Sequence, residues 1–415
     1  MHIYLSRETK NVYFFEHMVT FNLDVPIHKD NIGLSYVTYC ICNGINDINA
    51  IVSCLIKAFN ITNSLEDVKE MILLCTIEDN SLSKVFTSDS SKANLTPTVN
   101  GAYEKRFPQL LHIELSSTCN FRCEHCYKSA ISNGVFADFD YLKRNIYQKF
   151  KGIIPIIHFT GGEATLHKQF RELVNLFSNG YLIQLTTNGS TIVSYPIDTF
   201  KRIQSIDISL YGLSAEDYKN NTGNADAFGK VCDGLKTLKN ACIDFRTTLV
   251  LNNDNWSKME DYIKLAIDLG ATSFGFALPM ISGKLMNTNT DKWQLATETK
   301  KSIYRSYRYI CDKYKTKIRI SDWYRMSYSD MWKTYPENDS LRCGAGKTNW
   351  WMSEKFVFRP CAFLPDEYIS LNYDTWSEYI SNQYEIDWTK AKTALEAFAT
   401  DNKTSIVDIC SIFRK

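Results

Sequence analysis

Residues 117–128 read STCNFRCEHCYK and place Cys119, Cys123 and Cys126 within eight residues. This C-x3-C-x2-C spacing lets one short loop wrap three thiolates around a metal centre. A structural zinc site takes four ligands, usually from paired C-x2-C knuckles, and no such arrangement lies here. A [4Fe-4S] cluster held by three cysteines instead leaves one iron without a protein ligand. The stretch therefore predicts a cluster with one iron that is free to bind another molecule.

The cysteine loop follows the first of six apolar, strand-like runs that alternate with helical stretches. The runs are LLHIEL near residue 111, IPIIHF near 155, YLIQLTT near 181, SIDISL near 205, FRTTLVL near 245 and SFGFAL near 273. Such alternation argues for a parallel sheet that is curved into a full or partial barrel. The polar stretches that follow these strands should converge at the carboxyl edge of the sheet, where βα folds build their active sites.

The cysteine loop after the first strand and TGGE at residues 160–163 after the second together resemble the motifs of the radical S-adenosylmethionine (SAM) superfamily. In that family the methionine amino and carboxylate groups of SAM chelate the open iron. Glycines let backbone groups approach a charged ligand closely, and the Glu163 carboxylate can pair with the ammonium. The resemblance covers roughly residues 108–300 and implies an α/β fold with a partial (β/α)6 radical SAM barrel, placed at residues 96–320.

Further residues match weaker motifs of the same family. His125 precedes the last cysteine, at a position that is usually aromatic and lies against the adenine. Thr222 or a neighbour stands near the place where many relatives carry an arginine after the fourth strand. The resemblance implies SAM contacts from His125, Gly161, Gly162, Glu163, Thr187, Asn188, Ser209, Thr222 and Asn252. Ordinary turn formation is the alternative role for the softer positions, because NG and Ser/Asp-rich turns are common for local reasons.

The chemistry that this resemblance implies is reductive cleavage of SAM. An electron from the cluster would split a sulfonium carbon–sulfur bond and release methionine and a 5'-deoxyadenosyl radical, which abstracts hydrogen from an unactivated carbon. The cofactor does the difficult step, and the protein positions the substrate and excludes competing reactions. A reductant such as flavodoxin or ferredoxin is therefore an expected partner.

A second group of cysteines lies near the C-terminus. Cys343-Gly-Ala-Gly and Arg359-Pro-Cys361 resemble the opening of the SPASM/Twitch extension, in which a hairpin joins two such motifs at an auxiliary iron–sulfur site. Only Cys410 follows, so residues 321–415 resemble the shorter Twitch type. The resemblance implies one auxiliary [4Fe-4S] or [2Fe-2S] cluster on Cys343, Cys361 and Cys410. In the alternative, the site is degenerate and Cys410 is a buried apolar residue.

The N-terminal residues 1–95 carry the pattern of a small winged-helix-like domain. Apolar positions repeat with a helical period from Asp47, a predicted N-cap, to Phe59. A second helix is predicted from Ser64, with Asp67 three residues later as a capping-box variant. Strand-like runs precede these helices at residues 11–15, 19–25 and 34–41, with a C-N-G turn at 42–44. Residues 79–104 are rich in Ser, Asn and Thr and predict a linker.

A DNA-binding role for this domain is disfavoured, because Glu66, Asp67 and Glu70 outnumber Lys69 on the second helix and would repel phosphate. The arrangement instead resembles the RiPP recognition element of ribosomally made peptides. That module binds a leader peptide as an additional strand of its sheet. The alternative is a small domain that only braces the barrel.

Composition sets the remaining expectations. The 415 residues include 47 basic and 46 acidic side chains, so no global charge would attract nucleic acid or anionic membrane. The start of the chain lacks a signal-peptide pattern, and no long apolar run occurs. We therefore expect a cytoplasmic protein. In a reducing compartment, the 13 cysteines predict metal binding or catalysis rather than a disulfide framework.

The three modules in this order resemble radical SAM maturases of ribosomally synthesised precursor peptides. The leader would bind the N-terminal domain while the core segment reaches the barrel, and this tethering raises the effective concentration. The hypothesis is an intramolecular cross-link, either a thioether or a C–C or C–O bond. Two alternatives are a peptide epimerase and, from another class, a catalytically degenerate peptide-binding protein.

Overall fold

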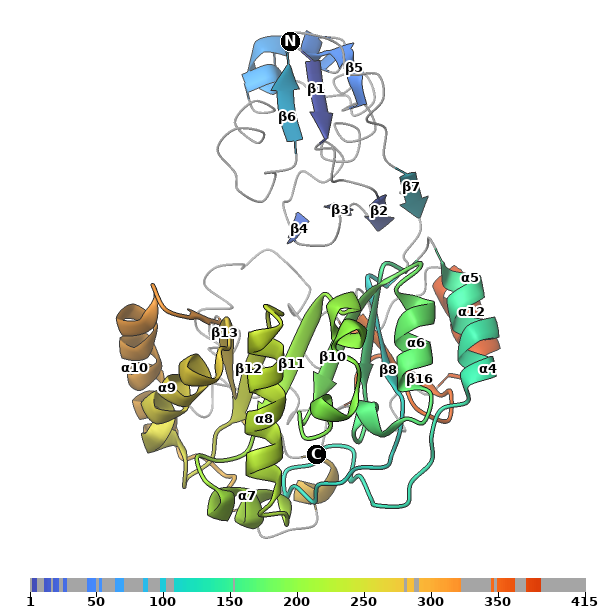
Figure 1. Ribbon diagram of the computed structural model, residues 1–415. Helices are drawn as coiled ribbons and strands as arrows, with labels where there is room; N and C mark the ends of the chain where they lie inside the picture. The colour runs from blue at the N-terminus through green and yellow to red at the C-terminus, as the bar shows by residue number, and fades with distance from the viewer. Residues whose placement is uncertain are drawn as a thin grey trace. The chain divides into compact units, whose positions relative to one another are not determined.

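The structure is a computed structural model of the whole chain (Figure 1). It describes residues 2–5, 11–15, 18–21, 25–27, 43–49, 52–53, 64–70, 85–88, 98–101, 108–151, 154–279, 282–286, 291–321, 345–346, 349–362 and 371–381. The chain divides into two compact units. The smaller is built mainly from Met1–Gln109, and the larger mainly from Leu110–Lys149 and Ile156–Glu378.

The larger unit is built on one sheet with the strand order β14-β13-β12-β11-β10-β9-β8-β15-β16. All neighbouring strands are parallel except the last pair, β15 and β16. The strands are β8 (Leu110–Glu114), β9 (Ile156–Thr160), β10 (Leu182–Thr187), β11 (Ser205–Leu210), β12 (Arg246–Val250), β13 (Ser273–Ala277), β14 (Arg319–Ile320), β15 (Asn349–Met352) and β16 (Phe358–Arg359). The predicted α/β fold is confirmed: the six predicted strands, β8 to β13, lie side by side in chain order.

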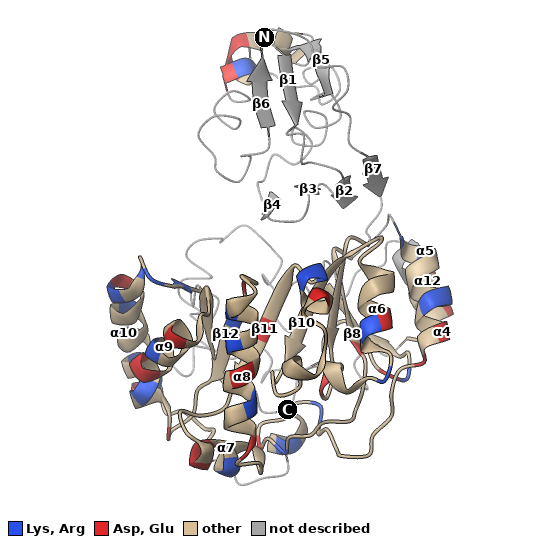
Figure 2. Cartoon of the chain, viewed as in Figure 1, with Lys and Arg blue, Asp and Glu red and all other residues tan. Residues whose placement is uncertain are grey.

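Helices connect the parallel strands, and Figure 1 shows α6 and α8 lying across the sheet. The longer ones are α6 (Phe170–Phe177), α7 (Ala215–Thr222), α8 (Ala227–Asn240), α9 (Met259–Leu269), α10 (Thr297–Tyr314) and α12 (Tyr373–Ser381). Shorter turns are α4 (Phe139–Tyr141), η2 (Leu142–Tyr147), α5 (Gln148–Phe150), η3 (Ala164–Leu166), η4 (Ile192–Ser194), η5 (Ile197–Arg202), η6 (Trp256–Lys258) and η7 (Gly283–Met286). Both charge signs are interspersed on helices such as α9 and α10 (Figure 2).

Local sequence explains where these helices begin and end. The Ser214 hydroxyl accepts a hydrogen bond from the Asp217 N–H (3.1 Å) and caps the start of α7. The helix ends at Gly223, which adopts the left-handed conformation that ends many helices. On α6, the buried residues Phe170, Leu173, Val174 and Phe177 recur with the helical period and face the sheet.

The sheet extends beyond the predicted barrel. Strand β15 pairs in parallel with β8, so that Trp351 lies beside His112. A turn at residues 353–357 then leads into β16, which is antiparallel to β15. The predicted hairpin between the two C-terminal cysteine motifs is present, but it belongs to the same sheet as the barrel strands. The sequence predicted a separate appendage from residue 321 onward and did not predict the pairing of β15 with β8. The strand has only four residues, which is too short for a recognisable strand pattern.

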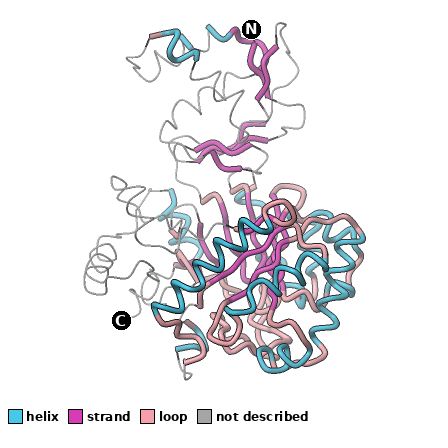
Figure 3. Tube along the Cα trace, turned by 90° about the vertical axis from the view of Figure 1, so that its left-hand side faces the viewer, coloured by secondary structure: helices cyan, strands magenta, loops and turns pink. Residues whose placement is uncertain are grey.

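The smaller unit contains two sheets, both visible in Figure 3. One has the order β5-β1-β6 and the other β4-β3-β2-β7. The strands are β1 (His2–Leu5), β2 (Asn11–Phe15), β3 (Met18–Phe21), β4 (Val25–Ile27), β5 (Asn43–Asp47), β6 (Val85–Ser88) and β7 (Thr98–Gly101). Neighbouring strands are antiparallel except β2 and β7, which are parallel.

Several predictions for this unit require correction. The strand at 11–15 is confirmed, whereas the run at 19–25 divides between the antiparallel strands β3 and β4. The predicted turn at 42–44 is wrong for residues 43 and 44, which begin strand β5. The predicted linker contains strands β6 and β7, because β-branched residues in these short runs pair with β1 and β2. The expected strand at 34–41 lies outside the described residues.

The two predicted helices of this unit are helical wherever the structure describes them. Residues 48–49 and 52–53 are helical, and Ile48 and Val52 are buried as the apolar stripe requires. The Ser64 hydroxyl accepts from the Asp67 N–H, and the Asp67 carboxylate accepts from the Ser64 N–H, both at 3.2 Å. This reciprocal pair is the predicted capping box.

Among the described residues, no helix combines the length and apolar character needed to cross a bilayer.

The C-terminal hairpin is anchored by aromatic packing, which generates a stability prediction. Trp376 of α12 is fully buried, and its ring stacks on Phe358 of β16 with centroids 4.2 Å apart. Trp376→Ala should lower the free energy of unfolding of the larger unit by about 3–5 kcal/mol, since it removes a large buried ring. Urea denaturation measures this. Val193→Ala, at a side chain that is 52% exposed, is the control and should change the value by less than about 0.5 kcal/mol. Equal effects of both variants would contradict the packing described.

Candidate functional site

The predicted cysteine loop leaves the carboxyl end of β8. Cys119 and Cys123 are buried and Cys126 is half-buried. The sulfur of Cys119 accepts a hydrogen bond from the Phe121 N–H (3.3 Å), and that of Cys126 from the Ala130 N–H (3.4 Å). Backbone N–H groups aimed at sulfur stabilise negative charge there, as thiolate ligands require.

The surroundings of the thiols alone do not favour the charged form. Burial, followed by the nearby Glu163 carboxylate, raises the pKa of Cys119 to about 12. Burial and the neighbouring thiols Cys126 and Cys119 also raise the pKa of Cys123. A cationic metal centre would reverse this balance, because metal binding requires deprotonated thiols. Among the described residues, no three His, Cys, Asp or Glu side chains meet as ligands of a single ion. The three cysteine thiols of the loop suit an iron–sulfur cluster instead, because in a cluster each cysteine binds a different iron.

The two glycines of TGGE pack against the cysteine loop. A Cβ on Gly161, which has φ +124°, would lie 2.5 Å from the Ser116 carbonyl oxygen. A Cβ on Gly162 would lie 2.3 Å from the carbonyl oxygen of Thr118. The Gly162 N–H also donates to the Ser116 carbonyl at 2.6 Å. The structure therefore supplies a reason for these glycines that adds to the predicted ligand approach: the end of β9 lies directly against the start of the cysteine loop.

Glu163 is buried and its carboxylate is held by neutral donors. Its Oε1 accepts from the Thr165 hydroxyl (2.5 Å), the Thr165 N–H (3.1 Å) and the Thr187 hydroxyl (2.6 Å). Its Oε2 accepts from the Asn188 N–H (2.7 Å). Burial raises the pKa of this carboxyl, and the hydrogen bonds oppose that shift. No ion pair to Glu163 occurs in the described part of the chain, and Oε2 retains accepting capacity for a cationic group.

A hydrogen-bond network links the end of β10 to the cysteine loop. The Asn188 amide donates to the Asn120 Oδ1 (2.8 Å), and its own Oδ1 accepts from the Ser190 hydroxyl (2.7 Å). The Asn120 amide in turn donates to Ser190 Oγ (2.9 Å). Sequence reasoning singled out Thr187 and Asn188 but missed Asn120 and Ser190. Asn120 and Ser190 are about 70 residues apart in the sequence, so no local pattern predicts their hydrogen bond. The position of Asn120 inside the cysteine motif was the one feature of the sequence that could have indicated its role.

Three softer predictions have side chains that are partly engaged in local bonds. Ser209 lies in β11 and Asn252 just after β12, whereas Thr222 is the last residue of α7. Ser209 is half-buried on β11 and shares a hydrogen bond with the Tyr211 phenol. The Thr222 hydroxyl donates to the Tyr218 carbonyl (2.6 Å), while the Thr222 carbonyl accepts from Arg122 N–H of the cysteine loop (2.8 Å). Asn252 Oδ1 accepts from the N–H groups of two following residues (2.9 and 3.0 Å). Turn formation thus accounts for part of the role of Asn252.

His125 is enclosed by aromatic rings. Its ring centroid lies 4.5 Å from that of Trp293 and 5.9 Å from that of Tyr211. Burial, followed by the charge of Lys292, lowers the pKa of His125 to about 4, so the imidazole is neutral near pH 7. Its Nδ1 is buried without a hydrogen-bond partner among the described residues. Trp293 was not predicted, because the stretch after β13 that carries it has no motif.

The segment after β13 also reaches the cysteine loop. The Lys284 N–H donates to the Cys126 carbonyl (3.1 Å). Gly283 has φ +54°, and a Cβ there would lie 2.2 Å from the Tyr127 carbonyl oxygen. The cysteine loop, which follows β8, is therefore contacted by residues that follow four other strands: β9, β10, β11 and β13.

Comparison with known proteins supports this geometry. Residues 113–266 match the sequence model of the Radical SAM superfamily. They form a radical SAM domain. The family implies a [4Fe-4S] cluster and SAM binding, in agreement with the three-cysteine donor set and the buried carboxylate beside it.

Individual relatives share this domain. The antilisterial bacteriocin subtilosin biosynthesis protein AlbA of Bacillus subtilis is 23% identical over 283 residues, which are 66% of this chain and 59% of that protein. A probable GTP 3',8-cyclase of Saccharolobus islandicus is 30% identical over 167 residues, 39% of this chain and 53% of that protein. The chain thus spans between half and two thirds of the length of each of these two relatives.

Among solved structures, Streptococcus suis SuiB bound to the precursor peptide SuiA superimposes with a TM-score of 0.60. The alignment covers 90% of this chain and 88% of SuiB at 14% identity. At this identity the likeness concerns the fold, and it extends well beyond the radical SAM domain.

The face of the radical SAM sheet opposite the helices carries polar side chains. Phe159 of β9 packs on Phe177 of α6 with ring centroids 5.4 Å apart, so the preceding residue, His158, lies on the other face. Half-buried polar residues occupy that face on successive strands: His112, His158, Thr186, Asp207, Arg246 and Thr248.

These side chains form a partly satisfied row. His158 Nε2 shares a hydrogen bond with the Thr186 hydroxyl (2.8 Å), and the Thr248 hydroxyl donates to Asp207 (2.6 Å). The Nδ1 atoms of His112 and His158 are buried without a hydrogen bond in the described residues, whereas the Nε of Arg246, which also lacks one, forms an ion pair with Asp207 (3.7 Å). Unpaired buried polar atoms are uncommon, so this row can accommodate hydrogen bonds from a ligand.

The hydrogen bond from Thr187 to Glu163 gives a second prediction. Thr187→Val keeps the shape of the side chain but removes one donor from a buried carboxylate, which should cost about 1–3 kcal/mol in unfolding free energy. Thr237→Val on α8 is the control, because its hydroxyl bonds only a carbonyl of its own helix (2.8 Å), and it should change stability by less than about 0.5 kcal/mol. Urea denaturation measures both. A neutral Thr187→Val variant would show that this hydroxyl does not support the carboxylate.

The buried histidines predict a pH dependence. Burial lowers the pKa of His158 from 6.5 to about 4, and burial with the neighbouring His158 charge lowers that of His112. The folded state resists protonation, so this stability is complete above pH 6.5 and is lost as the pH falls towards 4. The loss from His158 alone should be about 3 kcal/mol. In His158→Asn, denaturation midpoints should fall less steeply over this range. If the denaturation midpoint of His158→Asn fell as steeply with pH as that of wild type, His158 would not be the source of the pH dependence.

Proposed function

We propose that this chain is a radical SAM peptide maturase that forms an intramolecular cross-link in a ribosomally synthesised precursor peptide. The cross-link would be a thioether or a C–C or C–O bond. The observation that carries the proposal is the polar row on the face of the sheet opposite α6, where the Nδ1 atoms of His112 and His158 have no hydrogen-bond partner among the described residues. Likeness to AlbA along the sequence and to SuiB across 90% of the chain supports the same class of substrate.

We assign the cluster ligands to Cys119, Cys123 and Cys126, and the SAM-facing positions to the strand ends around them. Bound there, the cluster and SAM supply a 5'-deoxyadenosyl radical for removal of a hydrogen atom from the peptide. Glu163 is placed to bind the SAM ammonium, since its carboxylate is buried beside the cysteines and Oε2 can accept a further hydrogen bond. His125 and Trp293 would present a neutral aromatic surface to the adenine.

Further SAM contacts are proposed at residues near the strand ends and at the end of α7. These are Gly161, Gly162, Thr187, Asn188, Ser209, Thr222 and Asn252. The network through Asn120 and Ser190 supports the arrangement, because it holds the end of β10 against the cysteine loop.

The N-terminal unit is proposed to bind the leader peptide. In the described residues, β5 and β6 are the outer strands of a three-stranded antiparallel sheet. A peptide that adds a strand to such an edge gains backbone hydrogen bonds without a preformed cavity. The winged-helix-like assignment of residues 1–95 and the Twitch-type assignment of residues 321–415 belong to this proposal.

An auxiliary iron–sulfur cluster at the C-terminus is also proposed. Cys361 is half-buried and follows strand β16, whereas Cys343 and Cys410 lie outside the described residues. The hairpin β15–β16 supports the assignment, because it occurs between the two cysteine motifs as the Twitch resemblance implies. A cytoplasmic location and reduction by a flavodoxin or ferredoxin complete the proposal.

Anaerobic reconstitution with iron and sulfide tests the radical SAM activity directly. With dithionite and SAM, the wild-type protein should release 5'-deoxyadenosine, and Cys123→Ala should reduce the release to background because it removes one cluster ligand. Cys232→Ala on α8 is the matched control and should retain activity and iron content. Zinc in place of iron, or full activity in Cys123→Ala, would refute the assignment. No release from the wild-type protein would favour a catalytically degenerate binding protein.

The type of modification can be read from the mass of a precursor peptide, which is to be sought as a short reading frame beside the one that encodes this chain. A cross-link removes one hydrogen from each of the joined atoms, so the peptide should lose the mass of a hydrogen pair. An epimerase would leave the mass unchanged in ordinary water and introduce deuterium in heavy water.

A further inference from the structure

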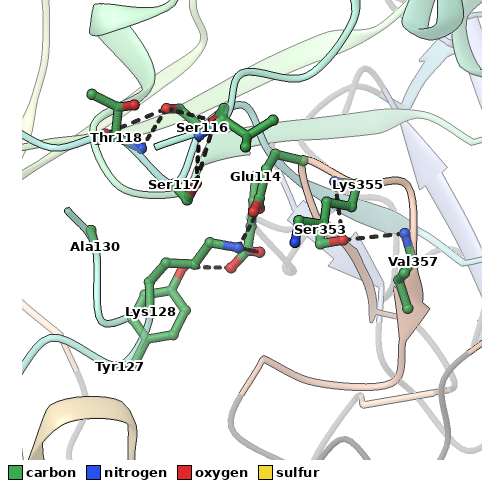
Figure 4. Close-up of polar contacts among 12 residues, drawn as sticks. Glu114, Ser116, Ser117, Thr118, Tyr127, Lys128, Ala130, Ser353, Lys355 and Val357 are labelled. Carbon is green, nitrogen blue, oxygen red and sulfur yellow. Dashed lines mark hydrogen bonds and ion pairs between the residues drawn. The ribbon is translucent and has the colours of Figure 1, made fainter. Parts of the chain in front are cut away.

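Lys128 lies two residues after Cys126 and its ammonium is almost enclosed by protein. The side chain is 11% exposed, and it forms ion pairs with Glu114 and with Glu354, whose side chains are each 7% exposed. Figure 4 shows the Lys128 side chain reaching the Glu114 carboxylate at the end of β8. None of these three residues is among the predicted cluster ligands or SAM contacts.

The two carboxylates come from opposite ends of the larger unit's sequence. Glu114 is the last residue of β8, and Glu354 lies in the turn between β15 and β16, 226 positions after Lys128. A buried charge that loses one partner is left uncompensated, so such groups hold each other in place strongly. The Lys128 ammonium therefore ties the C-terminal hairpin to the end of the cysteine loop.

Glu114 also holds the residue between Cys126 and Lys128. The Tyr127 hydroxyl donates to Glu114 Oε1 at 3.1 Å (Figure 4). The Tyr127 ring meets Trp351 of β15 edge-on, with centroids 6.0 Å apart. Both residues that follow the last cysteine are thus fixed by side chains of β8 and of the hairpin.

We propose that Glu354 is a positioning residue for the cluster: acting through Lys128, it holds the chain after Cys126 so that this thiolate stays on its iron. The C-terminal hairpin then contributes to the radical SAM site itself, independently of any cluster of its own. This inference rests on the proposed function, because it takes Cys126 as a cluster ligand.

The test uses the reconstituted full-length protein and follows iron loss to a chelator under anaerobic conditions. Glu354→Gln keeps the size of the side chain but removes its charge. It should release iron about tenfold faster than wild type, because the loss of an outer-shell partner typically weakens metal affinity by about ten- to a hundredfold. The electron paramagnetic resonance spectrum of the dithionite-reduced cluster should also change. Lys355→Gln is the matched control, since it alters an exposed residue of the same turn; it should behave as wild type.

A double variant shows whether Glu354 acts through Lys128. Lys128→Met should also accelerate iron loss, and Lys128→Met with Glu354→Gln should be no faster than Lys128→Met alone. Additive effects, or wild-type iron loss and spectrum in Glu354→Gln, would overturn the inference. Thermal unfolding of the cluster-free proteins checks the fold. If Glu354→Gln unfolds, Glu354→Asp replaces it: the shorter side chain withdraws the carboxylate from Lys128, so iron loss should be faster than in wild type, and wild-type iron loss would overturn the inference.

The outcomes separate the two proposals. A wild-type protein that binds no iron–sulfur cluster refutes the proposed function. A wild-type protein that binds the cluster and cleaves SAM, with Glu354→Gln equal to wild type in iron loss and spectrum, refutes only the role of Glu354.

Discussion

The close approach of two loops is the constraint on which the site depends. Backbone atoms of Gly161 and Gly162 contact the carbonyl groups of Ser116 and Thr118 at distances that leave no room for a Cβ. The next residue, Glu163, is consequently buried beside Cys119, and its carboxylate takes its hydrogen bonds from the ends of β9 and β10. A buried carboxylate near three thiols is unfavourable by itself. The cationic iron centre and the SAM ammonium that the radical SAM domain implies would offset this cost, the first at the thiolates of Cys119, Cys123 and Cys126 and the second at Glu163.

The sequence predicted the central fold because each strand from β8 to β13 is an apolar run with a polar stretch after it. That local pattern suffices for order and direction, since the strands follow each other in the sheet. The capping box at Ser64 was predictable for the same reason, as both partners lie within one helical turn. The strands β6 and β7 and the pairing of β15 with β8 were missed, because these strands are short and their partners are distant in sequence.

The site was predicted only in part, for a related reason. The cysteines and Glu163 belong to compact motifs, whereas their supports are long-range contacts. Asn120 bonds Asn188 and Ser190 across about 70 residues, and Trp293 meets His125 from beyond β13. The glycines of TGGE were expected to let a ligand approach closely. The structure shows that the Ser116 and Thr118 carbonyl groups also leave no room for a side chain at these positions. The sequence motifs therefore identified the chemistry of the site. The positions of the supporting side chains could be known only from the folded structure.

The pairing of β8 with β15 has a consequence for how the protein is made. On the ribosome, β8 emerges long before residues 349–352, so one of its edges has no partner until most of the chain has been translated. An unpaired edge in a nascent chain invites pairing with other polypeptides. Folding of the larger unit is thus completed late in synthesis, and a nascent chain stalled before β15 exposes a strand that chaperones must shield.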